Sequence, residues 1–269
     1  MLNFSLLVPH PPAIIPGVSV SIRKFEKTIN ALLNTSLRLR QANIEVLIIL
    51  SPHGEIRPDS FTIQVPPEPI FQANFAEFNA PNIQFTIPRE RILTAKIIEA
   101  VNSAGLKIEP LKSDQLDFGA AVPLFYFKNA LPKIEIVSLG VSLANLSQHY
   151  EFGKILRAVV SETQKRVAII ASGELAHRIF KNSPHGFSPL AKIWDEELIA
   201  DLRNEKFEKI LIRDSFEAEE VGECGLRPLA TLLGSSENFT PEILSYESPG
   251  GIGVAVMIMN NAKSKIKKC

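Results

Sequence analysis

The sequence predicts an α/β protein, a single domain of three layers in which helices cover both faces of a mostly parallel, mixed central sheet. Short apolar runs rich in β-branched residues, such as residues 46–50 and 166–171, alternate with longer stretches whose apolar side chains have helical spacing. Such alternation is typical of a parallel sheet flanked by helices. No linker or repeat divides the chain, so we expect one domain over residues 1–262 and a basic tail over 263–269.

The individual elements follow in order along the chain. Strands are expected at residues 3–8, 46–50, 61–65, 106–111, 134–141, 166–171, 243–247 and 252–259. Helices are expected at residues 20–43, 90–104, 150–164, 191–202, 206–212 and 230–233. The spacing of apolar residues predicts the buried face of the first helix, made of Phe25, Ile29, Leu32, Leu33 and Leu37. The aromatic and proline-rich second half of residues 56–88 leaves two interpretations open, a lid or binding loop and an irregular segment packed on the core.

Composition excludes several classes of function. Among 269 residues, 29 are Lys or Arg and 29 are Asp or Glu, so no net charge favours nucleic acid or an anionic membrane. No apolar run reaches the roughly 18 residues that a membrane span needs. The only cysteines are Cys224 and the terminal Cys269, which argues against a structural disulfide and fits a reducing compartment. We expect a soluble cytoplasmic protein.

Three of the five histidines directly follow predicted strands: His10, His53 and His177. The carboxyl ends of parallel strands meet in one crevice, where open α/β sheets bind ligands. Neutral imidazole binds zinc, iron and copper, and two histidines with one further ligand are a common set. A lone histidine is more often a core or surface residue, but three at equivalent strand ends indicate one site. We expect His149 on the surface or at a helix cap, and His185 either beside the pocket or in a plain loop.

The third ligand has two main candidates, Glu223 and Cys224, at the start of a helix after an acidic loop. A helix N-terminus favours an anionic ligand and lowers the pKa of a thiol. The alternative for Cys224 is a small buried apolar residue. Glu55 and Glu174 adjoin motif histidines, and the plain alternative for both is exposure to solvent.

Other catalytic motifs are absent from the sequence. No glycine-rich phosphate-binding loop follows a strand, no Gly-x-Ser-x-Gly surrounds Ser172, and no Cys-x-x-Cys occurs. Nucleotide binding and serine-nucleophile chemistry are therefore unsupported.

The order and spacing of five short motifs resemble the class III extradiol ring-cleavage dioxygenases of the LigB type, a superfamily that includes the Memo proteins. The motifs are Pro9-His10-Pro11-Pro12, Ser51-Pro52-His53-Gly54, Leu116-Asp117-Phe118-Gly119, Ser172-Gly173-Glu174-Leu175-Ala176-His177-Arg178 and Glu223-Cys224-Gly225-Leu226-Arg227-Pro228-Leu229. The resemblance covers nearly the whole chain. It implies that His10 and His53 bind a non-haem Fe(II) and that His177 acts as an acid/base beside a catechol.

The chain departs from the family pattern at two positions. The third ligand of the family comes from the segment that aligns with Glu223 and Cys224; the dioxygenases use Glu there and the Memo branch Cys. In our alignment Cys224 occupies the ligand position and Glu223 lies one residue away. Ring-cleaving members often carry a histidine where this chain has Phe118, which can neither donate nor accept a proton. Arg178 and His185 complete, with Phe118, the expected substrate-side residues.

Two functions follow from the resemblance. The first is an Fe(II)-dependent extradiol dioxygenase that acts on a catecholic or related aromatic substrate with O2. The alternative is a Memo-like metal-binding protein without ring cleavage, which zinc or copper would suit as well as iron. The expected partners are further copies of the chain or a functional link to an AMMECR-type protein. Nothing supplies the extra carboxylates of a two-metal hydrolase.

Overall fold

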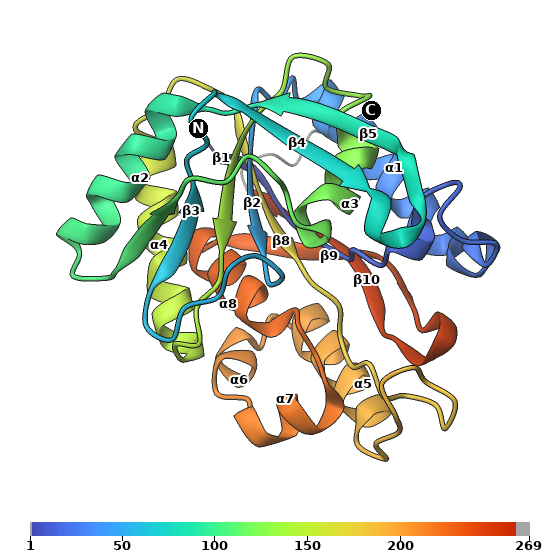
Figure 1. Ribbon diagram of the computed structural model, residues 1–269. Helices are drawn as coiled ribbons and strands as arrows, with labels where there is room; N and C mark the ends of the chain where they lie inside the picture. Colours follow the sequence, from blue (N-terminus) through green and yellow to red (C-terminus); the bar gives the residue numbers. More distant parts are fainter. Residues whose placement is uncertain (1, 262–269) are drawn as a thin grey trace, which may run out of the picture.

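The computed structural model describes residues 2–261, and an eight-stranded mixed sheet forms its centre (Figure 1). The strand order is β6-β3-β7-β2-β8-β1-β10-β9. The strands are β1 (Leu2–Val8), β2 (Val46–Ser51), β3 (Phe61–Gln64), β6 (Ile108–Leu111), β7 (Glu135–Gly140), β8 (Val167–Ser172), β9 (Phe239–Glu247) and β10 (Val254–Asn261). The predicted fold class, a single mixed α/β domain with a mostly parallel sheet, is confirmed. The predicted basic tail lies outside the described residues.

The four central strands β7, β2, β8 and β1 run parallel, and antiparallel pairing begins at β3 and β10. β2 is buried along its whole length, as its apolar run predicts for a strand covered on both faces. The strands that precede His10 and His53 are not direct neighbours, because β8 pairs with both β1 and β2 and lies between them. All three strands nevertheless run in the same direction, so their carboxyl ends lie side by side at one end of the sheet.

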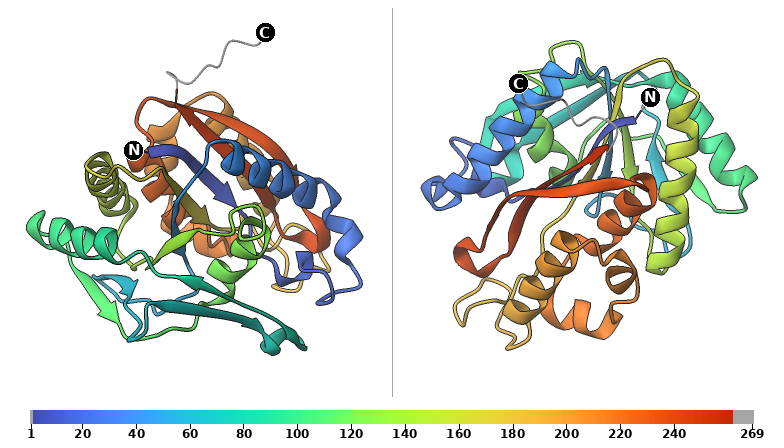
Figure 2. Two further views of the ribbon diagram at one scale, coloured as in Figure 1. Left: turned by 90° about the horizontal axis from the view of Figure 1, so that it is seen from above. Right: turned by 180° about the vertical axis from the view of Figure 1, so that it is seen from behind.

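Helices cover both faces of the sheet (Figures 1 and 2). The helices are α1 (Glu26–Gln41), α2 (Arg91–Ser103), α3 (Phe118–Phe127), α4 (Leu146–Ser161), α5 (Ala191–Arg203), α6 (Phe207–Leu211), α7 (Ser215–Val221) and α8 (Leu226–Ser235). One core cluster contains side chains of α2, α4, α5 and α8. The other contains side chains of α1, α3 and a small two-stranded sheet of β4 (Ile70–Phe75) and β5 (Ala80–Pro88). Each core cluster lies between the central sheet and the elements that cover one of its faces, which gives the predicted three layers.

The predicted buried face of α1 is partly wrong. Leu33 and Leu37 are exposed, while Leu32 and Leu39 are buried against the second cluster. Small polar side chains share the buried face with them, namely Thr28, Thr35 and Ser36. Their hydroxyl groups are satisfied by hydrogen bonds, for example from Thr35 to the carbonyl of Ala31, so they pack without an unpaired polar atom.

The proline-rich segment whose role the sequence left open forms a hairpin. β4 (Ile70–Phe75) and β5 (Ala80–Pro88) pair antiparallel, and a 3-10 turn, Ala76–Phe78, joins them. Phe71 and Phe75 are fully buried in the second cluster, so this hairpin packs on the core. At its tip, the ring of Phe78 reaches the ring of Phe118, at 5.5 Å between centroids.

Within residues 2–261, no helix combines the length and the apolar character that crossing a membrane requires.

Candidate metal centre

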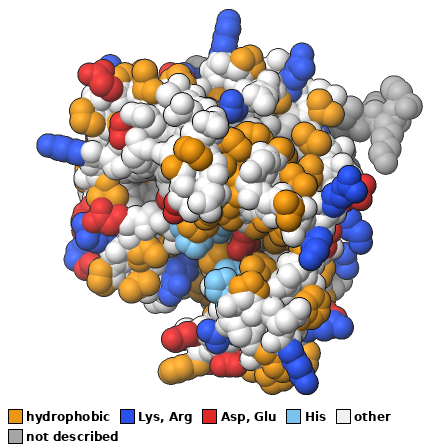
Figure 3. All heavy atoms as spheres, turned by 45° about the vertical axis from the view of Figure 1, so that its right-hand side comes forward, with side chains coloured by type: hydrophobic (Ala, Val, Ile, Leu, Met, Phe, Trp, Pro, Cys, Tyr) orange, Lys and Arg blue, Asp and Glu red, His pale blue; other side chains and the backbone are white. Residues whose placement is uncertain are grey.

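A cleft lies at the carboxyl ends of β1, β2 and β8. Figure 3 shows histidine side chains in this cleft, with apolar and acidic side chains beside them. His10 follows β1, His53 follows β2, and Glu174 and His177 follow β8. The predicted convergence of strand-end histidines is therefore a property of the fold. Cys224 reaches the same place from the turn before α8.

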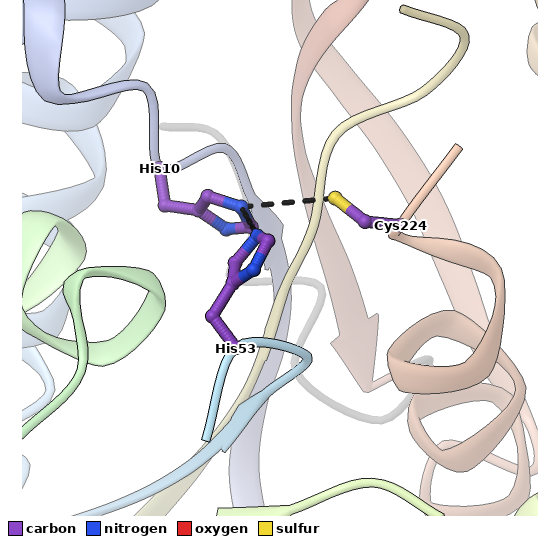
Figure 4. Close-up of side chains that lie close together, drawn as sticks. All are labelled: His10, His53 and Cys224. Atoms are coloured by element: carbon purple, nitrogen blue, oxygen red, sulfur yellow. Dashed lines mark hydrogen bonds between the residues drawn. The ribbon is translucent and has the colours of Figure 1, made fainter. Parts of the chain in front are cut away.

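His10, His53 and Cys224 form the central cluster (Figure 4). The Nε2 atoms of the two histidines lie 2.9 Å apart, and the Sγ of Cys224 lies 3.7 Å from the Nε2 of His10. Burial lowers the pKa of His10 to about 4 and lowers that of His53 as well. Both imidazoles are therefore neutral near pH 7, which is the state that binds a metal ion.

Ser172 determines which nitrogen of His10 carries the proton. Its hydroxyl group donates to the carbonyl of Gly119, which has no partner within α3 because residue 123 is a proline without an N–H. With its one hydrogen in use, the Oγ of Ser172 accepts from the Nδ1 of His10 at 2.8 Å. The lone pair of neutral His10 therefore lies on Nε2, facing His53 and Cys224. Such support is typical of metal-binding histidines.

The turn that carries His53 is held by Ser51 and Asp117. The backbone N–H of His53 donates to the Oγ of Ser51, and that hydroxyl donates to the carboxylate of Asp117, the N-cap of α3. Phe118, the first residue of the helix, stacks on the His53 ring with 4.2 Å between centroids. The apolar ring of Phe118 therefore covers one side of the histidine pair.

Cys224 is placed by a close approach of two backbones. A Cβ atom on Gly173 would lie 2.3 Å from the Cα of Gly225, so only glycine lets the end of β8 meet the turn before α8. The N–H of Glu174 donates to the Cys224 Sγ at 3.3 Å. Burial, and then the Glu174 carboxylate, raise the pKa of the Cys224 thiol well above its usual range. A bound cation is the kind of charge that would make it a thiolate ligand.

A second group of possible ligands shares Cys224: Glu174, His177 and Cys224. The alternative of solvent exposure does not hold for Glu174; its side chain is buried, with Oε2 3.1 Å from the Nε2 of His177. Burial pushes the Glu174 pKa upward, but the neighbouring imidazoles outweigh it and the pKa is lowered. Its Oε1 is buried and has no hydrogen-bond partner among residues 2–261. A buried carboxylate with an unpaired oxygen, beside two imidazoles and a thiol, fits a divalent cation.

The structure separates the two candidates for the third ligand. The carboxyl group of Glu223 accepts from the N–H of Leu226 at 2.6 Å and so caps α8, and burial raises its pKa to about 7. Among the described residues, Glu223 belongs to neither group of possible ligands, whereas Cys224 belongs to both. The assignment of ligands stays a prediction, with Cys224 in the favourable position.

The remaining candidates lie at the rim or elsewhere. His185 is exposed and its ring lies 5.2 Å from the ring of His177, while Arg178 donates from Nη1 to the carbonyl of Glu220. Their role in substrate binding stays a prediction. The expectation for His149 is wrong, because its ring is fully buried, with Nδ1 2.9 Å from the carbonyl of Asn145.

Two residues that support the site have no role predicted from the sequence. One is Ser172, which was considered only as a nucleophile. The other is Asp195, a fully buried carboxyl that accepts from the N–H of Ala176 and from the hydroxyl group of Tyr246, both at 2.8 Å. A buried Asp in an amphipathic helix could have been noticed, but no sequence pattern places it under the segment that carries His177.

Fold and site together define a class of protein, an α/β domain with a histidine-rich, metal-compatible crevice at the carboxyl ends of its strands. The family described as the catalytic LigB subunit of aromatic ring-opening dioxygenase matches residues 5–257. The chain belongs to this family, and the resemblance inferred from its motifs is confirmed.

Similar proteins include one relative by sequence and one solved structure. Protein CA_C1420 of Clostridium acetobutylicum is 30% identical over 99% of this chain, which spans about 60% of the length of that relative. The crystal structure of the uncharacterized protein JW3007 from Escherichia coli K12 aligns with a TM-score of 0.67 and 16% identity, over 96% of this chain and all of that one. The second similarity shows the fold alone.

Proposed function

We propose that this protein is a non-haem Fe(II)-dependent extradiol dioxygenase that opens the ring of a catecholic or related aromatic substrate. One observation carries the proposal: the Nε2 atoms of His10 and His53 converge 2.9 Å apart beside Cys224, within the crevice that also holds the His177–Glu174 pair. His10, His53 and Cys224 would hold the metal. Bound iron would supply the redox chemistry through which O2 reacts with an aromatic ring.

The residues around the cluster have separate tasks in this proposal. In neutral His177 the Nε2–H donates to the Glu174 carboxylate 3.1 Å away, so the free Nδ1 takes a proton from a substrate hydroxyl group, and Glu174 stabilises the imidazolium that results. Phe118 and Phe78 keep water from one side of His53. His185, at the rim, contacts the part of the substrate that extends from the crevice.

The test is an oxygen-consumption assay. Protein loaded anaerobically with Fe(II) is mixed with a panel of catechols and then with O2, and the ring-opened product is followed by its absorbance. We expect turnover by the loaded protein and none by the metal-free protein. His177→Gln should keep the iron but lose about 100-fold or more in rate, as removal of a general acid/base does. No oxygen uptake with any catechol would refute ring cleavage.

A second candidate is a Memo-like metal-binding protein without ring cleavage. Phe118 favours it, because phenylalanine stacks on His53 where ring-cleaving members often have a histidine. The softer thiol of Cys224 would suit zinc or copper as well as iron. In this case zinc and copper should bind as tightly as iron, and Cys224→Ser should weaken their binding. Full metal affinity in Cys224→Ser would argue against a thiolate ligand in either function.

We also propose that the protein works with a partner, either a further copy or an AMMECR-type protein. The support is the family resemblance. Size-exclusion chromatography with light scattering, alone and with the AMMECR-type protein, tests both forms.

A further inference from the structure

A second cavity, of about 760 Å³, lies outside the metal-binding crevice. It is lined by the start of α4, the connection between α6 and α7, part of α7, and the turn that leads into α8. Figure 1 shows α6 and α7 below the sheet. The volume of the cavity is within the range of pockets that bind small ligands. None of the three residues of the central metal cluster lines it.

The wall of this cavity is apolar and exposed. Ile212 is 81% exposed and Phe216 is 80% exposed, and the exposed side chain of Leu143 also lines the cavity. The floor consists of buried side chains, including Ala218 and Leu226. Large apolar side chains that surround a depression typically mark a binding surface. The volume of the cavity, about 760 Å³, suits the apolar part of a small molecule.

One positive charge in the cavity, that of Arg227, forms no direct ion pair among the described residues, although it lowers the pKa of the nearby Glu223 carboxyl against the effect of burial. Arg227 lines the cavity and, within the part of the chain that the structure describes, forms no ion pair and no side-chain hydrogen bond. The other arginine there, Arg213, pairs with Asp201 and lies over the ring of Trp194. Of the two acidic residues in the lining, Glu223 caps α8 and Glu219 is exposed at the edge. An unpaired guanidinium beside an apolar wall is complementary to an anion with an apolar body.

We propose that this cavity binds a small amphipathic carboxylate, with its apolar body on Ile212 and Phe216 and its carboxylate paired with Arg227. The site is independent of ring cleavage. It uses the Arg227 of the Glu223–Leu229 motif, to which the metal centre assigns no task. Four residues of the turn and helix start that surround Cys224 line this cavity: Gly222, Glu223, Leu226 and Arg227.

The test uses sodium octanoate as the probe and titrates it into the full-length protein by calorimetry. The charge requirement is measured with octan-1-ol and octylamine, which share the chain length but not the negative charge. Octanoate should bind at least about tenfold more tightly than either, because a charge-assisted hydrogen bond contributes about that factor or more. No octanoate binding up to about 10 mM, the weak limit expected for a ligand of this size, would overturn the proposal.

Two pairs of variants locate the site. Arg227→Gln should weaken octanoate binding at least about tenfold, whereas Arg157→Gln, on the exposed side of α4, should not. Ile212→Ser should weaken binding about threefold or more, whereas Ile92→Ser, at a position on α2 that is 70% exposed, should not. All four side chains lie outside the core, so the variants should fold.

Two results would contradict the site even if octanoate binds. Equal affinity for wild type and Arg227→Gln would show that the carboxylate does not reach this arginine. A dimer in light scattering that Ile212→Ser dissociates would show that Ile212 and Phe216 form an interface between copies of the chain instead of a small-molecule site.

Discussion

Ser172 connects the metal-binding crevice to the interior of α3 through a single hydroxyl group. It donates to the carbonyl left free by Pro123 and accepts from the Nδ1 of His10, which fixes the tautomer of His10. A proline that removes one backbone hydrogen bond thereby contributes to the orientation of a candidate ligand. The effect depends on two segments about fifty residues apart in sequence, which no local motif relates.

Ser172→Ala should lower metal affinity about 10- to 100-fold, because His10 would lose the acceptor that fixes its tautomer. Competition with a chelator measures the affinity. Ser5→Ala is the matched control: Ser5 is equally buried on the adjacent strand β1, and its hydroxyl group has no hydrogen-bond partner in the described part of the chain. Equal losses in both variants would mean that Ser172 acts only through packing.

Asp195 should make stability depend on pH. Burial raises its pKa to about 7 from 3.8. Between about pH 4 and 7 the folded protein keeps a proton that the unfolded chain has lost, so the free energy of unfolding falls as the pH rises through this window. The difference of about three pKa units between the folded and unfolded states corresponds to a loss of at most about 4 kcal/mol in the free energy of unfolding.

Asp195→Asn should therefore reduce the loss of stability between about pH 4 and pH 8 by up to about 4 kcal/mol, measured by urea unfolding at each pH. Glu197→Gln is the control, since Glu197 is an exposed carboxyl on the same helix. If the two variants show the same pH dependence, the carboxyl of Asp195 is not responsible.

At the scale of elements, α4 and α8 meet through two glycines. A Cβ on Gly153 would lie 2.0 Å from the carbonyl oxygen of Thr231, and one on Gly234 would lie 1.9 Å from that of Tyr150. The two helix backbones are therefore in direct contact. This contact positions α8, and with it the turn that carries Cys224.

Gly153→Ala should destabilise the protein by about 2 kcal/mol or more, measured by denaturant unfolding. Alanine gains about 1 kcal/mol of helix propensity, but the overlap with the Thr231 carbonyl costs more than that. Gln148→Ala, at an exposed position of the same helix, should change stability by only a few tenths of a kcal/mol. A Gly153→Ala protein as stable as wild type would show that the helices separate easily.

Elements with a strong local pattern were predictable, and relations between elements were not. The apolar run of β2 and the Pro-His turn after it indicated both the strand and the place of His53. The position of β8 between β1 and β2, and the burial of Glu174 and His149, depend on which distant segments pack together. The segment that forms α7 was predicted to be an acidic loop. Its glutamates outnumber the two residues of its buried apolar face, Ala218 and Val221, so no helical pattern stands out in the sequence.

For the whole molecule, the candidate ligands join distant parts of the chain. His10 lies 43 residues from His53 and 214 residues from Cys224. A metal ion held by all three would bind the folded protein and not the unfolded chain. Stability should then rise with metal concentration, by about 2.7 kcal/mol when the free metal is at 100 times Kd.

Thermal unfolding with and without excess metal measures this effect. The midpoint should rise for wild type and for His185→Asn, in which an exposed histidine outside the cluster is changed. It should not rise for His10→Asn/His53→Asn. A rise that persists in this double variant would place the bound metal elsewhere.

The turn and helix start at residues 222–227 contribute Cys224 to the metal cluster. Four other residues of the segment line the cavity proposed to bind octanoate, namely Gly222, Glu223, Leu226 and Arg227. Two ligands that touch one short segment become thermodynamically linked when either shifts its preferred position. The linkage is reciprocal: whatever factor octanoate applies to the affinity for metal, metal must apply to the affinity for octanoate. Titrating each ligand in the presence and absence of the other measures this factor, and a value different from one would show that the segment couples the two sites.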